Sequence, residues 1–195
     1  MQNNKRLFVI DGNSLLFRAF FATSMGDTSN IMRTSSGVPT NAIFAFANMI
    51  AKILSGMKMG DSIFIAFDAD GHTFRKEEFD QYKANRKPTD PVLVEQFPIS
   101  REFLDSISIV HYEEHGIEAD DIAGTVAKLA SKEGYNVQIY TSDKDYLQLI
   151  DGHITVNLLK TGLSNMEPMT EQSMLEHPKF GYKPLQIIDF KGLRG

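Results

Sequence analysis

The sequence contains no cysteine. Structural disulfides, thiolate zinc sites and cysteine nucleophiles are therefore excluded, and the composition is compatible with a reducing compartment. Any bound metal ion must be held by oxygen or nitrogen atoms.

Long hydrophobic runs are also lacking. The longest apolar stretch, 42–54, is interrupted by Asn48 and Lys52, whereas a membrane-spanning helix needs about 20 predominantly apolar residues. The run at 7–10 ends at Asp11 and is too short for the core of a signal peptide. We expect no membrane partner and a cytoplasmic location.

The sequence has only a small excess of negative charge. A length of 195 residues predicts one domain, and a net charge of -5 argues mildly against a nucleic-acid partner. The distribution is more informative, because five acids and no lysine or arginine fall within 113–121, while 82–87 holds Lys83, Arg86 and Lys87 and no acid. The average charge conceals one acidic site and one basic segment.

Short apolar runs alternate with longer helical patterns along the chain, which is typical of β-α-β units. The runs are continuously apolar, as expected for strands that are covered on both faces. We predict an α/β fold with a mostly parallel sheet, and strands at 7–10, 62–67, 109–112, 136–140 and, more weakly, 154–157.

Helix signals are clear in two places. Pro39 opens a pattern that runs to Leu54 and stops at Gly56, and a second pattern covers 119–132. A third helix, from about 91 to 106, contains Pro98 and should be kinked or split there. The polar segment 69–90 is longer than most connections and predicts a functional loop or lid.

Acidic residues follow several of the predicted strands. Asp11 follows the first, Asp68 the second, and Asp143 with Asp145 the fourth. The carboxyl ends of parallel strands meet at one edge of a sheet, so these acids should converge. Glu118, Asp120 and Asp121 begin a helix and add three more carboxylates.

Seven carboxylates at one edge repel one another unless a cation lies among them. Oxygen ligands suit Mg²⁺ or Mn²⁺, and two such ions about 3.5–4 Å apart recur in phosphodiester hydrolysis. Each motif also has a simpler interpretation, as a strand-to-turn sequence, a helix start or a solvated turn. The shared position at strand ends favours the metal site.

The basic segment carries aromatic residues as well. Phe74, Phe79 and Tyr82 interleave with Arg75, Lys83 and Arg86, a combination that single-strand binders use for stacking and phosphate contact. The alternative is a solvated helix, because acids and bases are mixed in its first half.

A competing motif lies at 67–73. Its Asp-x-Asp-Gly pattern resembles haloacid dehalogenase-type phosphatases, in which Asp68 would be the nucleophile and Asp70 the general acid. Two features weigh against it: an earlier strand carries its own Asp11, and His72 separates Gly71 from Thr73.

Taken together, the motifs resemble the 5′ nuclease domain of bacterial DNA polymerase I and the flap endonuclease family. The similar stretches, in family order, are 7–14, 37–42, 67–69, 74–75, Tyr82 with Lys83 and Arg86, 116–121 and 141–145. The resemblance implies a PIN-like 5′ nuclease core, with the segment 69–90 forming a helical arch between the second strand and the following helices.

The resemblance also implies roles for individual residues. The metal-site acids are Asp11, Asp68, Glu118, Asp120, Asp121, Asp143 and Asp145. Arg75, Lys83 and Arg86 match basic residues of the helical arch, and Lys83 and Arg86 are expected to take part in catalysis. The residues expected to contact nucleic acid are Arg75, Tyr82, Lys83, Arg86 and Lys87.

The implied activity is hydrolysis of DNA, and of RNA primers, from 5′ ends and at 5′ flaps, with two Mg²⁺ or Mn²⁺ ions, by a monomer. The family pattern continues beyond Leu193-Arg-Gly195 into further aspartates and a DNA-binding helical part. We therefore expect a truncated 1–195 core with impaired activity, and a non-catalytic nucleic-acid-binding remnant is a further alternative.

Overall fold

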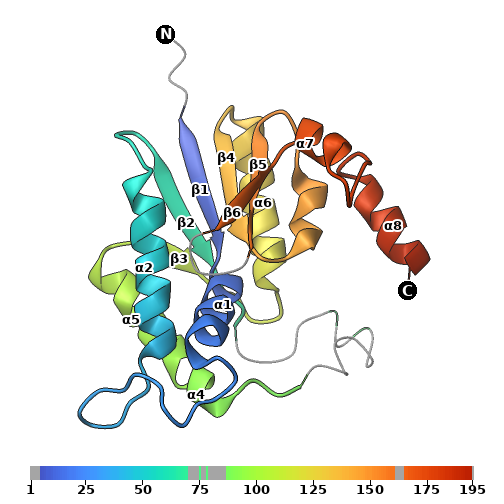
Figure 1. Cartoon of the computed structure of the whole chain (residues 1–195). Coiled ribbons are helices and arrows are strands. Elements are labelled where there is room, and N and C mark those ends of the chain that lie inside the picture. Colours follow the sequence, from blue (N-terminus) through green and yellow to red (C-terminus); the bar gives the residue numbers. More distant parts are fainter. Residues whose placement is uncertain (1–4, 70–74, 76–77, 79–86, 161–164, 195) are drawn as a thin grey trace.

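The structure, a computed structural model, describes residues 5–69, 75, 78, 87–160 and 165–194. Its centre is a six-stranded sheet in the order β3-β2-β1-β4-β5-β6, parallel except for the antiparallel pair β5 and β6 (Figure 1). The strands are β1 Arg6–Asp11, β2 Ser62–Ala66, β3 His111–Tyr112, β4 Asn136–Thr141, β5 Ile154–Leu159 and β6 Met166–Met169.

The five predicted strands are all present, and the mostly parallel α/β fold is confirmed. β3 is shorter than predicted, because only His111 and Tyr112 pair with β2. β6 was not predicted: its Met-Glu-Pro-Met sequence contains Pro168, which a strand tolerates at the edge of a sheet.

Helices fill the connections. They are α1 Gly12–Ser24, α2 Asn41–Ser55, α4 Pro91–Val94, α5 Gln96–Ser106, α6 Ala119–Lys132, the 3-10 helix η1 Lys144–Leu149, α7 Glu171–Glu176 and α8 Gln186–Arg194. The predicted helices at 39–54 and 119–132 correspond to α2 and α6. The predicted third helix is split, but at Glu95 and not at Pro98. Pro98 is the third residue of α5, in the first turn, where its missing N–H removes no hydrogen bond.

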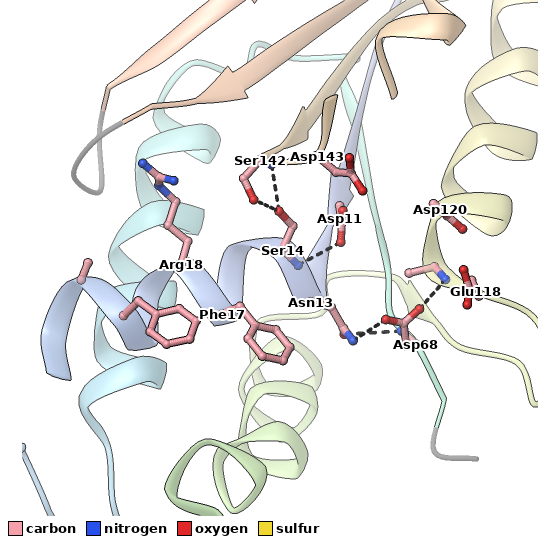
Figure 2. A pocket seen from close by; sticks show the side chains of 13 residues that line it. Asp11, Asn13, Ser14, Phe17, Arg18, Asp68, Glu118, Asp120, Ser142 and Asp143 are labelled. Atoms are coloured by element: carbon pink, nitrogen blue, oxygen red, sulfur yellow. Dashed lines mark hydrogen bonds between the residues drawn. The ribbon is translucent and has the colours of Figure 1, made fainter. Parts of the chain in front are cut away.

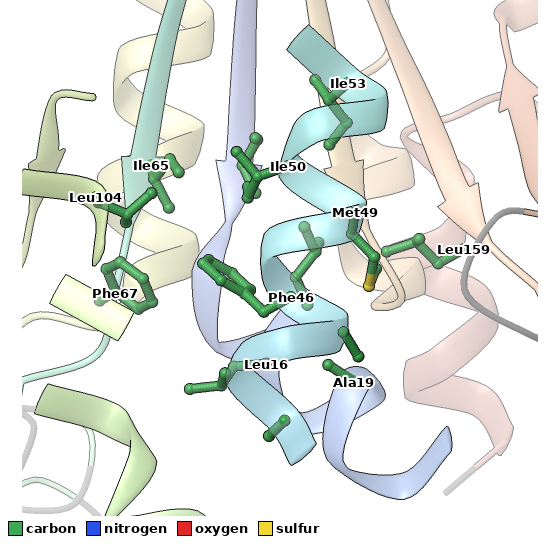
Figure 3. Packing of buried hydrophobic residues seen from close by; sticks show 14 of the residues in the cluster. Leu16, Ala19, Phe46, Met49, Ile50, Ile53, Ile65, Phe67, Leu104 and Leu159 are labelled. Carbon is green, nitrogen blue, oxygen red and sulfur yellow. The ribbon is translucent and has the colours of Figure 1, made fainter. Parts of the chain in front are cut away.

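Side chains along β1 point alternately to the two faces of the sheet and contribute to two hydrophobic cores. On one face, Phe8 and Ile10 belong to the same core as Phe46 and Ile50 of α2. Figure 3 shows the α2 side chains in this core. On the other face, Val9 packs with residues of α6 and η1. In Figure 1, α1, α2, α4 and α5 accordingly cover one face and α6 the opposite one. Both faces of the sheet are buried, which explains the continuously apolar strands.

The buried side chain of Gln96 links α2 with α4 and α5. The Gln96 side chain accepts hydrogen bonds from the backbone N–H groups of Ala42 (2.9 Å) and Ile43 (3.1 Å) at the start of α2, where Thr40 provides no side-chain cap. Its amide donates to Asn41 and to the Val92 carbonyl. Gln96 thus fixes α4 and α5 against the N-terminal end of α2.

Across the described ranges, the structure has no helix with the length and apolar character needed to cross a bilayer.

Candidate metal centre

The acidic site lies at the carboxyl edge of the central strands. Asp11 is the last residue of β1, Asp68 comes two residues after β2, and Asp143 two residues after β4. Because these strands are parallel neighbours, with β1 between β2 and β4, the three acids emerge at the same edge.

Asp11 is buried and fixed by protein donors. Its Oδ1 accepts from the Ser14 backbone N–H (3.0 Å), which caps α1, and its Oδ2 accepts from the Thr141 hydroxyl (2.9 Å). Burial raises the pKa of Asp11 to about 7, and the negative charges of Asp68 and Asp143 add to the effect. The carboxylate therefore lies where a positive charge would lower its free energy.

Asp68 connects three elements. Its Oδ1 accepts from the Ala119 N–H at the start of α6 (2.7 Å), and its Oδ2 accepts from the Asn13 amide of α1 (2.7 Å), as Figure 2 shows. The neighbouring Phe67 ring is buried and covered by the Arg101 guanidinium, 3.8 Å from its centroid. The position of Asp68 is thus determined by packing on both sides.

The α6 acids surround Arg75. Its guanidinium donates to both oxygens of Asp121 and to Glu118 (3.3 Å), and lies 4.0 Å from Asp120. Glu118 and Asp121 therefore share a face, as their spacing predicts. The pKa of Arg75 is raised, chiefly by its hydrogen bond to Asp121. Arg75, predicted to contact nucleic acid, here compensates the charge of these carboxylates.

Asp143 and Asp145 form the start of η1. Asp143 is the N-cap residue, and its Oδ1 accepts from the Asp145 N–H (2.9 Å). Asp143 is exposed toward the site, whereas Asp145 is half-buried and paired with Lys191 of α8.

Two adjoining pockets contain the seven predicted acids. The first, of about 690 Å³, is lined by five of them, Asp11, Asp68, Glu118, Asp120 and Asp143 (Figure 2). The second, of about 510 Å³, is lined by Asp121 and Asp145 together with Arg75, and shares Asp120 with the first. The predicted convergence of acids is therefore observed, but over two pockets.

The donor set fits a hydrated divalent cation. Within the part of the chain that the structure describes, no three acidic or histidine side chains are arranged to hold a metal ion directly. The oxygens of Asp11, Asp68 and Asp121 are instead turned to protein donors. Mg²⁺ typically keeps several waters and binds through one or two carboxylates, so a pocket of five carboxylates suits it without such a cluster.

Residues of α1 form a wall of the first pocket that the sequence did not predict. They are Asn13, Ser14, Phe17, Arg18, Phe21 and Ala22, and Ser142 lies opposite. The Ser14 hydroxyl accepts from the Ser142 N–H (2.8 Å), joining the ends of β1 and β4. The sequence contains one signal of this wall: Phe17 and Phe21 are spaced i, i+4 and lie on either side of Arg18. In the structure, Phe21 is 63% exposed.

The basic segment is described only in part. Tyr82, Lys83, Arg86 and also Asp70 of the competing phosphatase motif lie outside the described residues. Lys87 is exposed and lines a neighbouring cavity with Phe17 and Phe21, so it lies near the α1 wall.

Comparison with known proteins gives consistent results. Residues 6–179 match the family described as 5′-3′ exonuclease, N-terminal resolvase-like domain. DNA polymerase I of Bacillus caldotenax is 42% identical over 191 residues, and that of Bacillus subtilis (strain 168) over 195 residues, which cover 98% and 100% of this chain. The chain spans about a fifth (21%) of the length of these relatives.

A solved structure shares the fold. The T5 5′-exonuclease with bound divalent metal ions (zinc) superposes with a TM-score of 0.61 at 21% identity, covering 95% of this chain and 65% of that one.

Proposed function

The chain belongs to the family of 5′-3′ exonuclease N-terminal, resolvase-like domains, and from this premise we propose that it hydrolyses phosphodiester bonds in DNA at 5′ ends and 5′ flaps. RNA primers are a further substrate of the same reaction. One copy of the chain suffices, since a single chain supplies all seven acids, and the reaction takes place in the cytoplasm.

One observation carries this proposal: five carboxylates from separate parts of the sequence line a single pocket whose other wall is Phe17, Arg18 and Phe21. Carboxylates alone would repel a DNA phosphate. Carboxylates with a divalent cation and an adjacent arginine form a site that attracts it.

The metal is proposed to be Mg²⁺ or Mn²⁺, consistent with the divalent ions named for the T5 5′-exonuclease. When bound, such an ion lowers the pKa of a water molecule and stabilises the leaving oxygen. Asp11, Asp68, Glu118, Asp120 and Asp143 would hold the first ion, and Asp121 and Asp145, in the adjoining pocket, would contribute to a second position.

The protein groups have separate tasks in this scheme. Arg18 and Lys87 hold phosphates and Phe17 stacks on a base beside the acids. Lys83 and Arg86 contact the phosphates next to the cut, from an arch formed by 69–90 that also carries Tyr82. Arg75 exchanges its carboxylate partners for phosphate when the substrate enters.

The alternatives have weaker support. A haloacid dehalogenase-like phosphatase needs Asp70 in addition to Asp68. Residues 6–179 match the 5′-3′ exonuclease family instead, and Asp68 lines a pocket with four other carboxylates. A non-catalytic nucleic-acid-binding remnant would have no need of five clustered carboxylates.

Cleavage of a labelled 5′-flap DNA under single-turnover conditions, with the 195-residue chain in excess, tests the proposal. We expect Mg²⁺-dependent release of the flap, abolished by EDTA and reduced at least about 100-fold in Asp68→Asn, since a metal ligand or its neighbour is lost. The matched variant Asp70→Asn should cleave like the wild type. Cleavage that survives EDTA and Asp68→Asn, or hydrolysis of an aryl phosphate that needs Asp70, would contradict the proposal.

A further inference from the structure

Tyr146 is a buried residue of the second core, beside the second pocket of the site. It belongs to η1, directly after Asp145, and its ring packs in the second core with Val9, Ala66 and Ala119. The residue is 2% exposed. A phenylalanine would fill this space equally well, so packing alone does not explain the hydroxyl.

The hydroxyl has no hydrogen-bond partner among the described residues. A buried donor without an acceptor is unfavourable and rare in folded proteins, and each instance points to a missing ligand, ion or water. Tyr146 also lines the second pocket, together with Asp120, Asp121 and Asp145.

The surroundings of the hydroxyl are strongly acidic. Burial raises the pKa of Tyr146 well above its usual value, and the negative charges of Asp11, Asp68, Asp120 and Asp143 raise it further. Four carboxylates from separate elements are thus close enough to act on one phenol. The hydroxyl, a hydrogen-bond donor, therefore faces a region of oxygen acceptors.

The surrounding carboxylates do not satisfy this donor. Both oxygens of Asp11 and both of Asp68 already accept hydrogen bonds from other groups, and the Tyr146 hydroxyl makes no hydrogen bond to Asp120 or Asp143. An oxygen atom of a ligand that enters the site would supply the acceptor.

We propose that Tyr146 is a positioning residue of the metal centre, whose hydroxyl donates to an oxygen of the hydrated divalent cation held by the surrounding carboxylates. This inference rests on the proposed function, which requires that cation. It assigns to Tyr146 a contribution to metal affinity and none to folding, because its donor is satisfied only when the cation is bound.

Tyr146→Phe tests the assignment, with Tyr140→Phe as the matched control. Tyr140 is also partly buried, but its ring stacks on Phe8 and its hydroxyl lies near Arg6, away from the acids. Melting temperature in EDTA and Mn²⁺ affinity by calorimetry are measured for both variants and the wild type. Because the chain has no tryptophan, tyrosine difference absorbance provides a third signal.

We expect Tyr146→Phe to melt in EDTA at or above the wild-type temperature and to bind Mn²⁺ about tenfold more weakly. Mn²⁺ should produce a tyrosine difference band in the wild type and in Tyr140→Phe, and none in Tyr146→Phe. Unchanged Mn²⁺ affinity in Tyr146→Phe, or an unchanged wild-type tyrosine spectrum on metal binding, would overturn the assignment of Tyr146. Neither result would contradict the proposed function. Absence of Mn²⁺ binding by the wild type would overturn the metal centre of the proposed function as well.

Discussion

Asp11 is buried and has four neighbours, two hydrogen-bond donors and two charged carboxylates, whose effects on its pKa oppose one another. The Ser14 N–H and the Thr141 hydroxyl favour its ionised form, whereas burial and the charges of Asp68 and Asp143 disfavour it, and burial is the largest influence. The net result is a pKa of about 7, far above the ordinary value of 3.8. A carboxyl group in this state binds a proton near neutral pH and releases it when a cation arrives.

This predicts a specific pH dependence of stability. Because the pKa of Asp11 is higher in the folded than in the unfolded chain, its contribution to stability is full below about pH 4 and is lost as the pH rises to about 7. The loss amounts to about 4 kcal/mol for this shift. Melting curves in EDTA between pH 5 and 8 should therefore show a steeper decline for the wild type than for Asp11→Asn.

Metal provides the control for that experiment. A cation beside Asp11 replaces the proton, so the decline in melting temperature should largely disappear in saturating Mg²⁺. Equal slopes for the wild type and Asp11→Asn in EDTA would show that Asp11 is ionised throughout this range.

At the scale of elements, the junction of β1 and α1 requires a glycine. A Cβ atom at Gly12 would lie 2.3 Å from the ring of Phe67, which is fully buried. The first turn of α1 therefore lies very close to Phe67, the residue that follows β2. This close approach places Asp11 and Asp68 near each other. Phe67 has little room to move, since Arg101 covers its ring and Phe46 packs beside it.

Gly12→Ala should destabilise the protein by about 1–3 kcal/mol, as overpacking of a core does. Because the shifted ring immediately precedes Asp68, Mg²⁺ affinity should fall as well. Gly124→Ala is the matched control: its Cβ would meet Leu149 at 3.4 Å, and alanine in a helix interior is favourable, so stability should stay equal or rise. Thermal melting and calorimetry check both variants, and a stable Gly12→Ala with normal Mg²⁺ affinity would contradict this account of the junction.

Sequence patterns predict those elements whose signals are local. The buried strands and α6 were predicted because their apolar runs and end signals reflect local chemistry. α1 was not predicted, because half-buried Phe17 and exposed Phe21 lie beside buried Leu16 and Phe20 and obscure the helical period. The rings of Phe17 and Phe21 interrupt the pattern and also line the acid pocket. The position of the break before α5 depends on Gln96, which acts across 54 residues of sequence and leaves no local signal.

At the scale of the whole molecule, topology accounts for the predictable part of the site. Parallel strands with acids at their carboxyl ends bring those acids to one edge of the sheet, independently of the contacts that the side chains make. The pairing of Arg75 with Asp121 and the burial of Tyr146 could not be predicted, because both depend on side chains meeting across different elements. Sequence patterns thus predicted where the charges gather, and the structure adds how they are divided between two pockets.

Because acids are concentrated at one edge of the sheet, we expect the stability of the whole chain to depend on divalent cations. The net charge is -5, and seven of the negative charges lie around two adjoining pockets with Arg75 as a compensating group. A ligand that binds only the folded state stabilises it by mass action, by about 2.7 kcal/mol at 100 times its dissociation constant. For a domain of this size, that corresponds to an increase in melting temperature of roughly 5–10 °C.

We therefore expect Mg²⁺ to raise the melting temperature of the chain, and NaCl of equal ionic strength to raise it far less, because screening does not replace a bound ion. Asp120→Asn combined with Asp121→Asn should remove most of the Mg²⁺ effect, since Asp120 lines both pockets and Asp121 lines the second. The control, Glu171→Gln combined with Glu176→Gln on α7, removes the same charge from residues that line neither pocket. If both double variants responded to Mg²⁺ alike, the cation would be acting on the general charge of the protein, and the acids at the sheet edge would not form its binding site.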